Sequence, residues 1–479
     1  MSKEGLDKPK IAVVGGGIAG STIALYLSEL GLNVSLFEKG PSLVNGPPIC
    51  HLHAGGNLYR EISDEQCIIL LKESIDLVRF YPHAVDYRPT VIAVPTDDKG
   101  SPEDLYARLE MLKEEYAALI KEDHHNKVLG ESEEYYKLFS KEEVEALQKK
   151  QSKSSPTSLD EWMIPVVKNI DLSKVQFPLI MVQEYGLNVF RLASTASLLL
   201  QEKDNCRILL KHRVNDISQR DESGRWSVSY DHAGKTEKES FDFLINAAGF
   251  RTGKVDDMLG FKRERFVEFK AAYVTKCNTA DTWPEVVFLG ERGTPKGMAQ
   301  FTPYPDGYFQ LHGMTKSITL FEEGLVKSSA NSAYPKLKTK FMDKIEKAWK
   351  PEDVSKRSRL AIEHLAYYIP AFTKAEVVSK PLYGAQQIPG DDDSLRAANV
   401  SFERDHYARC EIVKASSVLT MADIITDKLI ELDYLPKEIL GKRDFASLLA
   451  LEENRVSEHA QKLCENREYP ISLSQRIVS

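Results

Sequence analysis

The 479-residue chain lacks both long apolar runs and an excess of basic charge. No stretch of about 18 apolar residues occurs, so we expect no transmembrane helix. The formal net charge of −8 counts against a nucleic-acid-binding protein, because such proteins usually present a basic face. Residues 1–10 are polar and lack the apolar core of a signal peptide, which predicts a cytoplasmic location.

Closely spaced cysteines are also absent. The six cysteines form no CxxC pair, so the sequence predicts free thiols and gives no indication of a metal site. Internal repeats are missing as well. A chain of this length with 42% hydrophobic residues exceeds one compact domain, so we expect two closely packed domains.

The clearest pattern that is present is a βαβ unit near the N-terminus. The apolar run 11–14 predicts a buried parallel strand, the spacing of apolar residues over 23–30 predicts a helix, and 34–37 predicts a second strand. A glycine-rich turn, GGGIAG at residues 15–20, joins the first strand to the helix. This arrangement is typical of a Rossmann-type dinucleotide-binding unit.

Each position of the turn has a physical role. Gly15 allows the tight turn, Gly17 lets the backbone approach a pyrophosphate, and Gly20 lets the helix pack closely on the sheet. The N–H groups at the helix start, including those of Ile18 and Ala19, are then directed at the phosphates. The turn therefore predicts a phosphate-binding cradle.

An acidic residue ends the second strand. Glu38 is placed to accept hydrogen bonds from a ribose diol, and Lys39 follows it at the same site. We favour FAD over NAD because the unit lies at the N-terminus and no second G-x-G-x-x-G occurs. A later predicted strand, 243–246, also leads into small residues. It resembles the late strand of FAD enzymes of the glutathione-reductase-like kind, which implies that Ala248 and Gly249 lie near the adenosine.

The rest of the chain predicts an α/β protein with a second sheet. We expect a central parallel sheet in the FAD-binding domain and a mixed or antiparallel sheet in a substrate domain with a helical insertion. The segments 207–210, 226–230 and 235–241 indicate a β-meander, and 443–465 indicates one amphipathic helix packed on the protein surface. We assign 1–90, 181–258 and 381–435 to the FAD domain, 91–180 to the insertion, 259–380 to the substrate-domain sheet and 436–479 to a C-terminal helical tail.

Three segments resemble the D-amino-acid-oxidase-like (DAO) superfamily of FAD-dependent oxidoreductases: 49–55 (ICHLHAG), 243–249 (FLINAAG) and 412–420 (IVKASSVLT). Within that superfamily the sequence is most similar to L-2-hydroxyglutarate oxidases, with malate:quinone oxidoreductases and glycine oxidases as neighbours. The segment 383–389 (YGAQQIP) departs from the Gly-x-Arg-Pro pattern that is usual there. The resemblance implies that the turn at Ala415, Ser416 and Ser417 lies beside the flavin ring.

The expected catalytic groups lie on two segments. His53 follows the βαβ unit on a glycine-rich stretch that should pass the flavin, with His51 and Gly55 as cofactor contacts. Tyr308 and His312 lie in predicted strands of the sheet that we expect to cover the substrate site. An arginine would clamp a substrate carboxylate bidentately, and the candidates are Arg88, Arg251 and Arg409.

These observations predict an FAD-dependent oxidoreductase. The expected substrate is a small carboxylate-bearing 2-hydroxy or 2-amino acid, which gives a hydride to flavin N5 before electrons pass to O2 or a quinone. One alternative is an NAD(P)H-dependent flavin monooxygenase of the aromatic-hydroxylase type, which shares the N-terminal motif. Another is a flavin-bound protein that acts in assembly or RNA modification.

Overall fold

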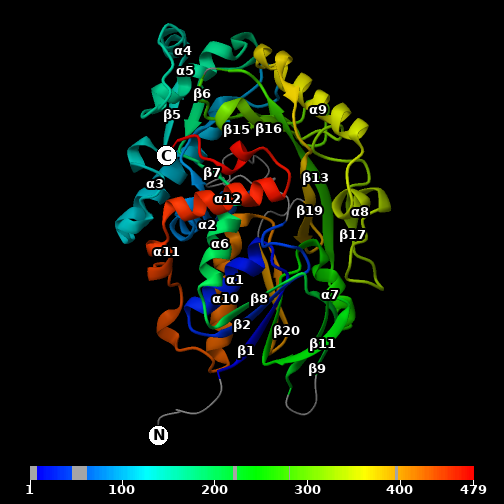
Figure 1. Cartoon of the computed structure of the whole chain (residues 1–479). Helices are drawn as coiled ribbons and strands as arrows, with labels where there is room; N and C mark the ends of the chain where they lie inside the picture. Colours follow the sequence, from blue (N-terminus) through cyan, green and yellow to red (C-terminus); the bar gives the residue numbers. More distant parts are fainter. Residues whose placement is uncertain (1–7, 46–61, 220–223, 280, 394–397, 479) are drawn as a thin grey trace.

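The computed structural model describes residues 8–45, 62–219, 224–279, 281–393 and 398–478. The predicted His51, His53 and Gly55 lie outside these residues. Two sheets organise the molecule, one in each half (Figure 1). The α/β fold with one mainly parallel and one mixed sheet is confirmed.

The first sheet is six-stranded, in the order β20-β21-β12-β1-β2-β8. All its neighbouring strands are parallel except β20 and β21. Its strands are β1 (Lys10–Val14), β2 (Asn33–Glu38), β8 (Cys206–Leu210), β12 (Phe243–Asn246), β20 (Asn399–Arg404) and β21 (Tyr407–Glu411). They come from three separate stretches of the chain.

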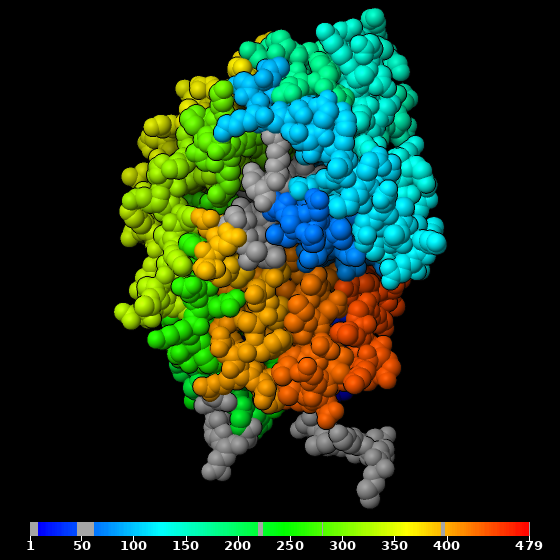
Figure 2. Space-filling model, turned by 180° about the vertical axis from the view of Figure 1, so that it is seen from behind, coloured from blue at the N-terminus to red at the C-terminus, as the bar shows by residue number. Residues whose placement is uncertain are grey.

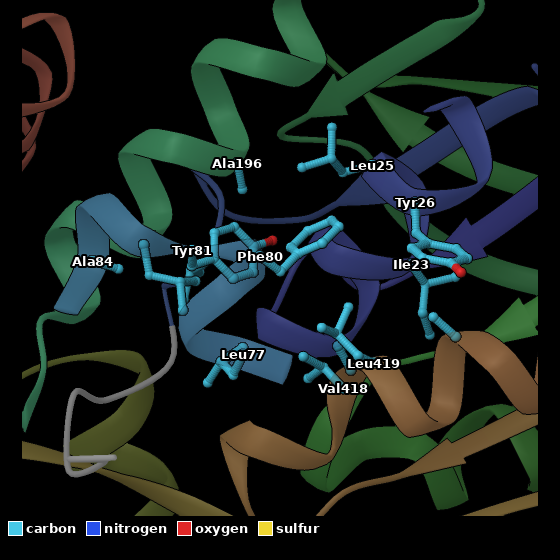
Figure 3. Close-up of a cluster of buried hydrophobic side chains, with 14 of the residues drawn as sticks. Ile23, Leu25, Tyr26, Leu77, Phe80, Tyr81, Ala84, Ala196, Val418 and Leu419 are labelled. Carbon is cyan, nitrogen blue, oxygen red and sulfur yellow. The ribbon is translucent and has the colours of Figure 1, made fainter. Parts of the chain in front are cut away.

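Both faces of this sheet are covered. Helices α1 (Ile18–Glu29), α2 (Asp64–Phe80), α6 (Val189–Gln201) and α10 (Val418–Glu431) form one apolar core with it. Figure 3 shows Tyr26 of α1, Leu77 and Phe80 of α2, and Val418 and Leu419 of α10 converging there. On the other face lies the antiparallel meander of β9 (Arg213–Gln219), β10 (Trp226–His232) and β11 (Lys235–Phe241).

The second sheet has ten strands, with the main order β17-β13-β16-β15-β14-β4-β6-β5 and with β18 and β19 also paired to β13. Helices α5 (Leu159–Asn169) and α9 (Pro351–Ala366) pack on one face of it. Its strands are β4 (Thr90–Ala93), β5 (Tyr136–Phe139), β6 (Leu179–Val182), β13 (Arg265–Lys276), β14 (Glu285–Phe288), β15 (Ala299–Pro303), β16 (Tyr308–Gly313), β17 (Leu325–Lys327), β18 (Glu376–Val377) and β19 (Leu382–Pro389).

The remaining elements are short or peripheral. A two-stranded sheet joins β3 (Val85–Asp86) to β7 (Gly186–Leu187). Helices α3 (Tyr106–Glu122) and α4 (Lys141–Leu147) belong to the insertion, whose side of the molecule also carries the C-terminal segment (Figure 2). The others are α7 (Thr252–Met258), α8 (Thr339–Glu346), α11 (Ala446–Ala450) and α12 (Glu453–Asn466). No described helix is long and apolar enough to cross a membrane.

Two sequence-based expectations were wrong in detail. The strand at 207–210 does not open the meander: β8 joins the parallel sheet beside β2, and β9 is the first meander strand. The C-terminal helix expected over 443–465 is two helices, because the chain is extended at Leu451 and Glu452 between α11 and α12. The first difference arises because the two residues Lys211 and His212 separate β8 from β9, and the second because Leu451, at the break between the helices, is buried.

Candidate active site

The glycine-rich turn has the geometry of a phosphate cradle. Gly15 has φ +107°, and a Cβ there would lie 2.4 Å from the carbonyl oxygen of Ala247. A Cβ on Gly20 would lie 1.7 Å from the carbonyl oxygen of Gly15. In contrast, a Cβ on Gly17 would meet no atom of the described residues within 4 Å. Packing inside the protein therefore explains the first two glycines, whereas Gly17 borders open space at the start of α1.

That open space suits a pyrophosphate. Gly17 is the N-cap of α1 and its backbone is extended, with no side chain to satisfy the first N–H groups of the helix, including those of Ile18 and Ala19. These donors and the positive end of the helix dipole favour an anion. Gly249, with φ +60°, also borders open space, at the carboxyl end of the neighbouring strand β12. The residues present therefore fit a dinucleotide such as FAD.

Glu38 ends β2 beside the same turn. Its carboxylate accepts hydrogen bonds from the backbone N–H of Gly16 at 2.8 Å and of Gly40 at 2.6 Å. Each oxygen keeps a further lone pair, so both can also accept from ribose hydroxyls. Lys39 is exposed next to it, and Ala248 lies at the end of β12 with its N–H 3.4 Å from Oδ1 of Asn246.

The turn Ala415–Ser417 leads directly into α10. Ser416 and Ser417 are buried, and Ser417 does not cap the helix with its side chain. Its hydroxyl donates instead to Glu73 of α2 at 2.6 Å, and burial raises the pKa of that carboxyl. Ser417 thus gives its hydroxyl to α2 and not to the start of α10, whose first N–H, that of Val418, donates to the carbonyl oxygen of Ala415.

A row of buried polar residues crosses one face of the ten-stranded sheet. Gln300 contacts Glu285, and Gln310 lies 2.5 Å from Nε2 of His312. The strand registers place these side chains on one face, together with Val274, which packs into the core of the six-stranded sheet. We call this row the polar strip; its members are Lys270, Glu285, Gln300, Thr302, Gln310, His312 and Gln386.

The strip reaches the turn before α10. Lys270 donates to Oε1 of Gln386 at 2.8 Å, and Nε2 of Gln386 donates to the carbonyl oxygen of Val413 at 2.6 Å. Lys270 also pairs with Glu268 at 2.9 Å. The polar strip is therefore hydrogen-bonded to the segment that the sequence places beside the flavin. The buried hydroxyl of Thr302 has no hydrogen-bond partner among the described residues, and a buried polar group without a partner is costly, so the strip is a candidate substrate surface.

The structure places the other predicted residues as follows. His312 lies on the strip and is buried. Tyr308 shares its face but lies at the start of β16, where the ammonium of Lys276 stands 4.8 Å from its ring centre.

Each arginine that was considered as a carboxylate clamp already contacts a protein carboxylate. Arg88 pairs with Glu285 at 2.7 Å, Arg251 with Glu346 at 2.8 Å and Arg409 with Asp256 at 2.9 Å. Sequence reasoning missed Lys270, Gln300, Gln310 and Gln386. The available signal was polar residues alternating with apolar ones in strands that are otherwise buried on both faces.

Among the described residues, no group of three or more His, Cys, Asp and Glu side chains could hold a metal ion. A family model described as FAD dependent oxidoreductase (DAO) matches residues 10–394. The chain belongs to this family. No curated protein sequence matches it. Membership of this family makes the protein an FAD-dependent oxidoreductase.

Solved structures similar to this FAD-dependent oxidoreductase share its fold at low identity. Glycine oxidase from Geobacillus kaustophilus is 12% identical, with a TM-score of 0.56 over 88% of this chain and 95% of its own. L-amino acid deaminase from Proteus vulgaris is 14% identical, with a TM-score of 0.57 over 95% and 98%. Glycerol-3-phosphate dehydrogenase from Bacillus halodurans, complexed with FAD, is 12% identical, with a TM-score of 0.56 over 98% and 74%.

Proposed function

We propose that the protein oxidises a small carboxylate-bearing 2-hydroxy or 2-amino acid, with O2 or a quinone as the final electron acceptor. The observation that carries this proposal is the polar strip, which faces the core of the six-stranded sheet and is bonded to the turn before α10. Of the similar structures, two are named as enzymes that act on amino acids and one as an enzyme that acts on glycerol-3-phosphate. These names support a substrate that is oxidised at a CH–NH or CH–OH group.

The dinucleotide would be held by two sets of residues. Gly15, Gly17, Ile18, Ala19 and Gly20 would bind its pyrophosphate, and Glu38 its ribose, with Lys39, Ala248 and Gly249 at the adenosine end. His51, Gly55 and the turn Ala415–Ser417 would contact the flavin. When bound, FAD supplies the hydride acceptor.

The substrate would be oriented by the strip. Gln300 and Gln310 offer amide groups that can fix a hydroxyl or amine, and His312 can accept its proton when the imidazole is neutral. Lys270 also pairs with a protein carboxylate, Glu268, but it belongs to the strip and its partner Gln386 is bonded to Val413, so it is the candidate cation for the substrate carboxylate. His53 remains a predicted base on the segment outside the described residues.

The experiment is anaerobic mixing of the yellow holoprotein with a panel of 2-hydroxy and 2-amino acids. We expect at least one acid to bleach the flavin absorbance without a nicotinamide. His312→Asn should retain FAD and slow the bleaching by roughly 100- to 10,000-fold, the usual contribution of general base catalysis. The exposed His125→Asn is the matched control and should leave the rate unchanged. Rapid bleaching by NADPH alone would instead select the monooxygenase alternative.

A further inference from the structure

The C-terminal segment is tied to the loop that follows β2. Arg467, at the end of α12, donates to the carbonyl oxygens of Val44 at 3.0 Å and Leu43 at 2.6 Å and to the hydroxyl of Ser42 at 3.1 Å. The partners are more than 420 residues apart in the sequence. One guanidinium therefore satisfies three acceptors of a loop that has no regular structure of its own.

That loop lies directly against the glycine-rich turn. The N–H of Val44 donates to the carbonyl oxygen of Gly16 at 2.7 Å, and a Cβ on Gly16 would lie 2.9 Å from a methyl of Leu43. Gly16 in turn donates its N–H to Glu38. The hydrogen bonds thus run without interruption from Arg467 through Val44 and Gly16 to the residue that should hold the ribose.

The loop conformation is strained. Val44 has φ +49°, in the left-handed region that β-branched residues rarely adopt. Such a conformation is unfavourable and persists only where surrounding contacts enforce it. Here the contacts on its two peptide groups are the bond to Gly16 and the bond from Arg467.

Arg467 is itself in an unusual setting. Its guanidinium is mostly buried, and burial lowers its pKa to about 10, so it is still charged at neutral pH. No carboxylate in the described part of the chain forms an ion pair with it. A buried cation that no carboxylate contacts directly is costly, and the negative charge of Glu38 offsets only part of the effect of burial on its pKa, so Arg467 is held here mainly by its hydrogen bonds to the loop.

We propose that Arg467 is a positioning residue for the FAD site: it holds the strained loop 42–44 against the glycine-rich turn and so keeps Gly16 and Glu38 in their binding geometry. Helix α12 carries it there by packing on α6, beside α1 (Figure 1). This inference rests on the dinucleotide site assigned above and is independent of the substrate. The family match ends at residue 394. The tail beyond residue 435, which lies outside that match, therefore contributes to cofactor binding.

The test is titration of the full-length apoprotein with FAD, followed by quenching of flavin fluorescence, together with the melting temperature of each apoprotein. Arg467→Ala should raise the FAD dissociation constant at least 10-fold. Arg467→Lys should recover part of the affinity, because an ammonium can reach some of the same carbonyl oxygens. The matched control is Arg455→Ala on α12, whose side chain is half exposed and pairs with Glu202; it should bind FAD like the wild type.

A double-mutant cycle tests the mechanism. Val44→Gly removes the backbone strain, so the loop should depend less on Arg467, and Arg467→Ala should weaken FAD binding by a smaller factor in that background. Equal FAD affinity of wild type and folded Arg467→Ala would overturn the proposal, as would an equal loss in both backgrounds. If Arg467→Ala does not fold, the comparison of Arg467→Lys with and without Val44→Gly decides by the same criterion. Failure of the wild type itself to bind FAD would refute the site assignment instead.

Discussion

The contrast between Gly17 and Gly20 gives a prediction that separates cofactor binding from folding. Gly17 has an extended backbone that any residue can adopt, and within the part of the chain that the structure describes a Cβ there meets no atom within 4 Å. Replacing a glycine N-cap by alanine costs about 0.5–1 kcal/mol of helix stability. Restricting the unfolded chain returns about 0.4–1 kcal/mol. The Gly17→Ala apoprotein should therefore be as stable as the wild type.

FAD binding should change far more. A methyl group at Gly17 would occupy the space beside the first N–H groups of α1 and keep the pyrophosphate away from them. Charge-assisted hydrogen bonds are worth about 1.5–3 kcal/mol each, so losing two removes about 3–6 kcal/mol. This corresponds to a dissociation constant raised by roughly 100- to 10,000-fold. Gly17→Val should have at least the same effect.

For the wild type and each variant, the assay measures the melting temperature of the apoprotein and, by fluorescence titration, the FAD dissociation constant. Gly20→Ala is the control, because its Cβ would lie 1.7 Å from the carbonyl oxygen of Gly15 and should destabilise the fold itself. An unchanged FAD affinity in Gly17→Ala would refute the assignment of the glycine-rich turn as the pyrophosphate-binding site. An unfolded Gly17→Ala apoprotein would refute the conclusion that the described residues leave space for a side chain at Gly17.

Three further outcomes are expected. Glu38→Ala should raise the FAD dissociation constant roughly 10- to 100-fold through loss of charge-assisted hydrogen bonds to the ribose, and an unchanged value would remove Glu38 from the site. Burial raises the pKa of Glu73 above 4.5, so the unfolded chain loses this proton at a lower pH than the folded protein does. The free energy of unfolding of the wild type, relative to that of Glu73→Gln, should therefore fall as pH rises from about 4.5 through the folded pKa and then level off. Chemical denaturation at several pH values measures it, and parallel pH curves for the two proteins would contradict the prediction. Asp256 is fully buried between Arg265 and Arg409, so Asp256→Ala should lower the free energy of unfolding in urea by about 3–5 kcal/mol. The control Asp343→Ala, which removes the more exposed partner of Lys347, should lower it by less than about 1 kcal/mol. Equal losses would show that burial of the Asp256 cluster adds nothing to stability.

The sequence predicted those parts of the molecule that local rules decide. The strand, glycine turn, helix and second strand over residues 10–38 were correct, because each glycine and each apolar spacing there reports on neighbours close in the chain. The strand 243–246 and its parallel pairing in the FAD sheet follow from the same apolar pattern. Helix α9 was not foreseen, although Pro351 at its first position and the acidic Glu352 and Asp353 are ordinary start signals.

The polar strip could not be predicted in the same way. Its members come from β13, β14, β15, β16 and β19, and they share a face only because of strand registers that no single segment encodes. Of these residues only His312 was selected from the sequence. The role of Arg467 was missed for the same reason, since its acceptors lie at the opposite end of the chain.

The order of strands in the parallel sheet has a consequence for synthesis. β12 lies between β1 and β21, so the sheet pairs residues near 12, 245 and 408, and the bond from Arg467 comes later still. A growing chain emerges from the ribosome N-terminus first, at about 5–20 residues per second. At this rate, β21 is synthesised at least about 20 seconds after the glycine-rich turn. Ribosome-bound chains that end before β21 should not capture FAD, and the cofactor should bind only after β21 has been synthesised.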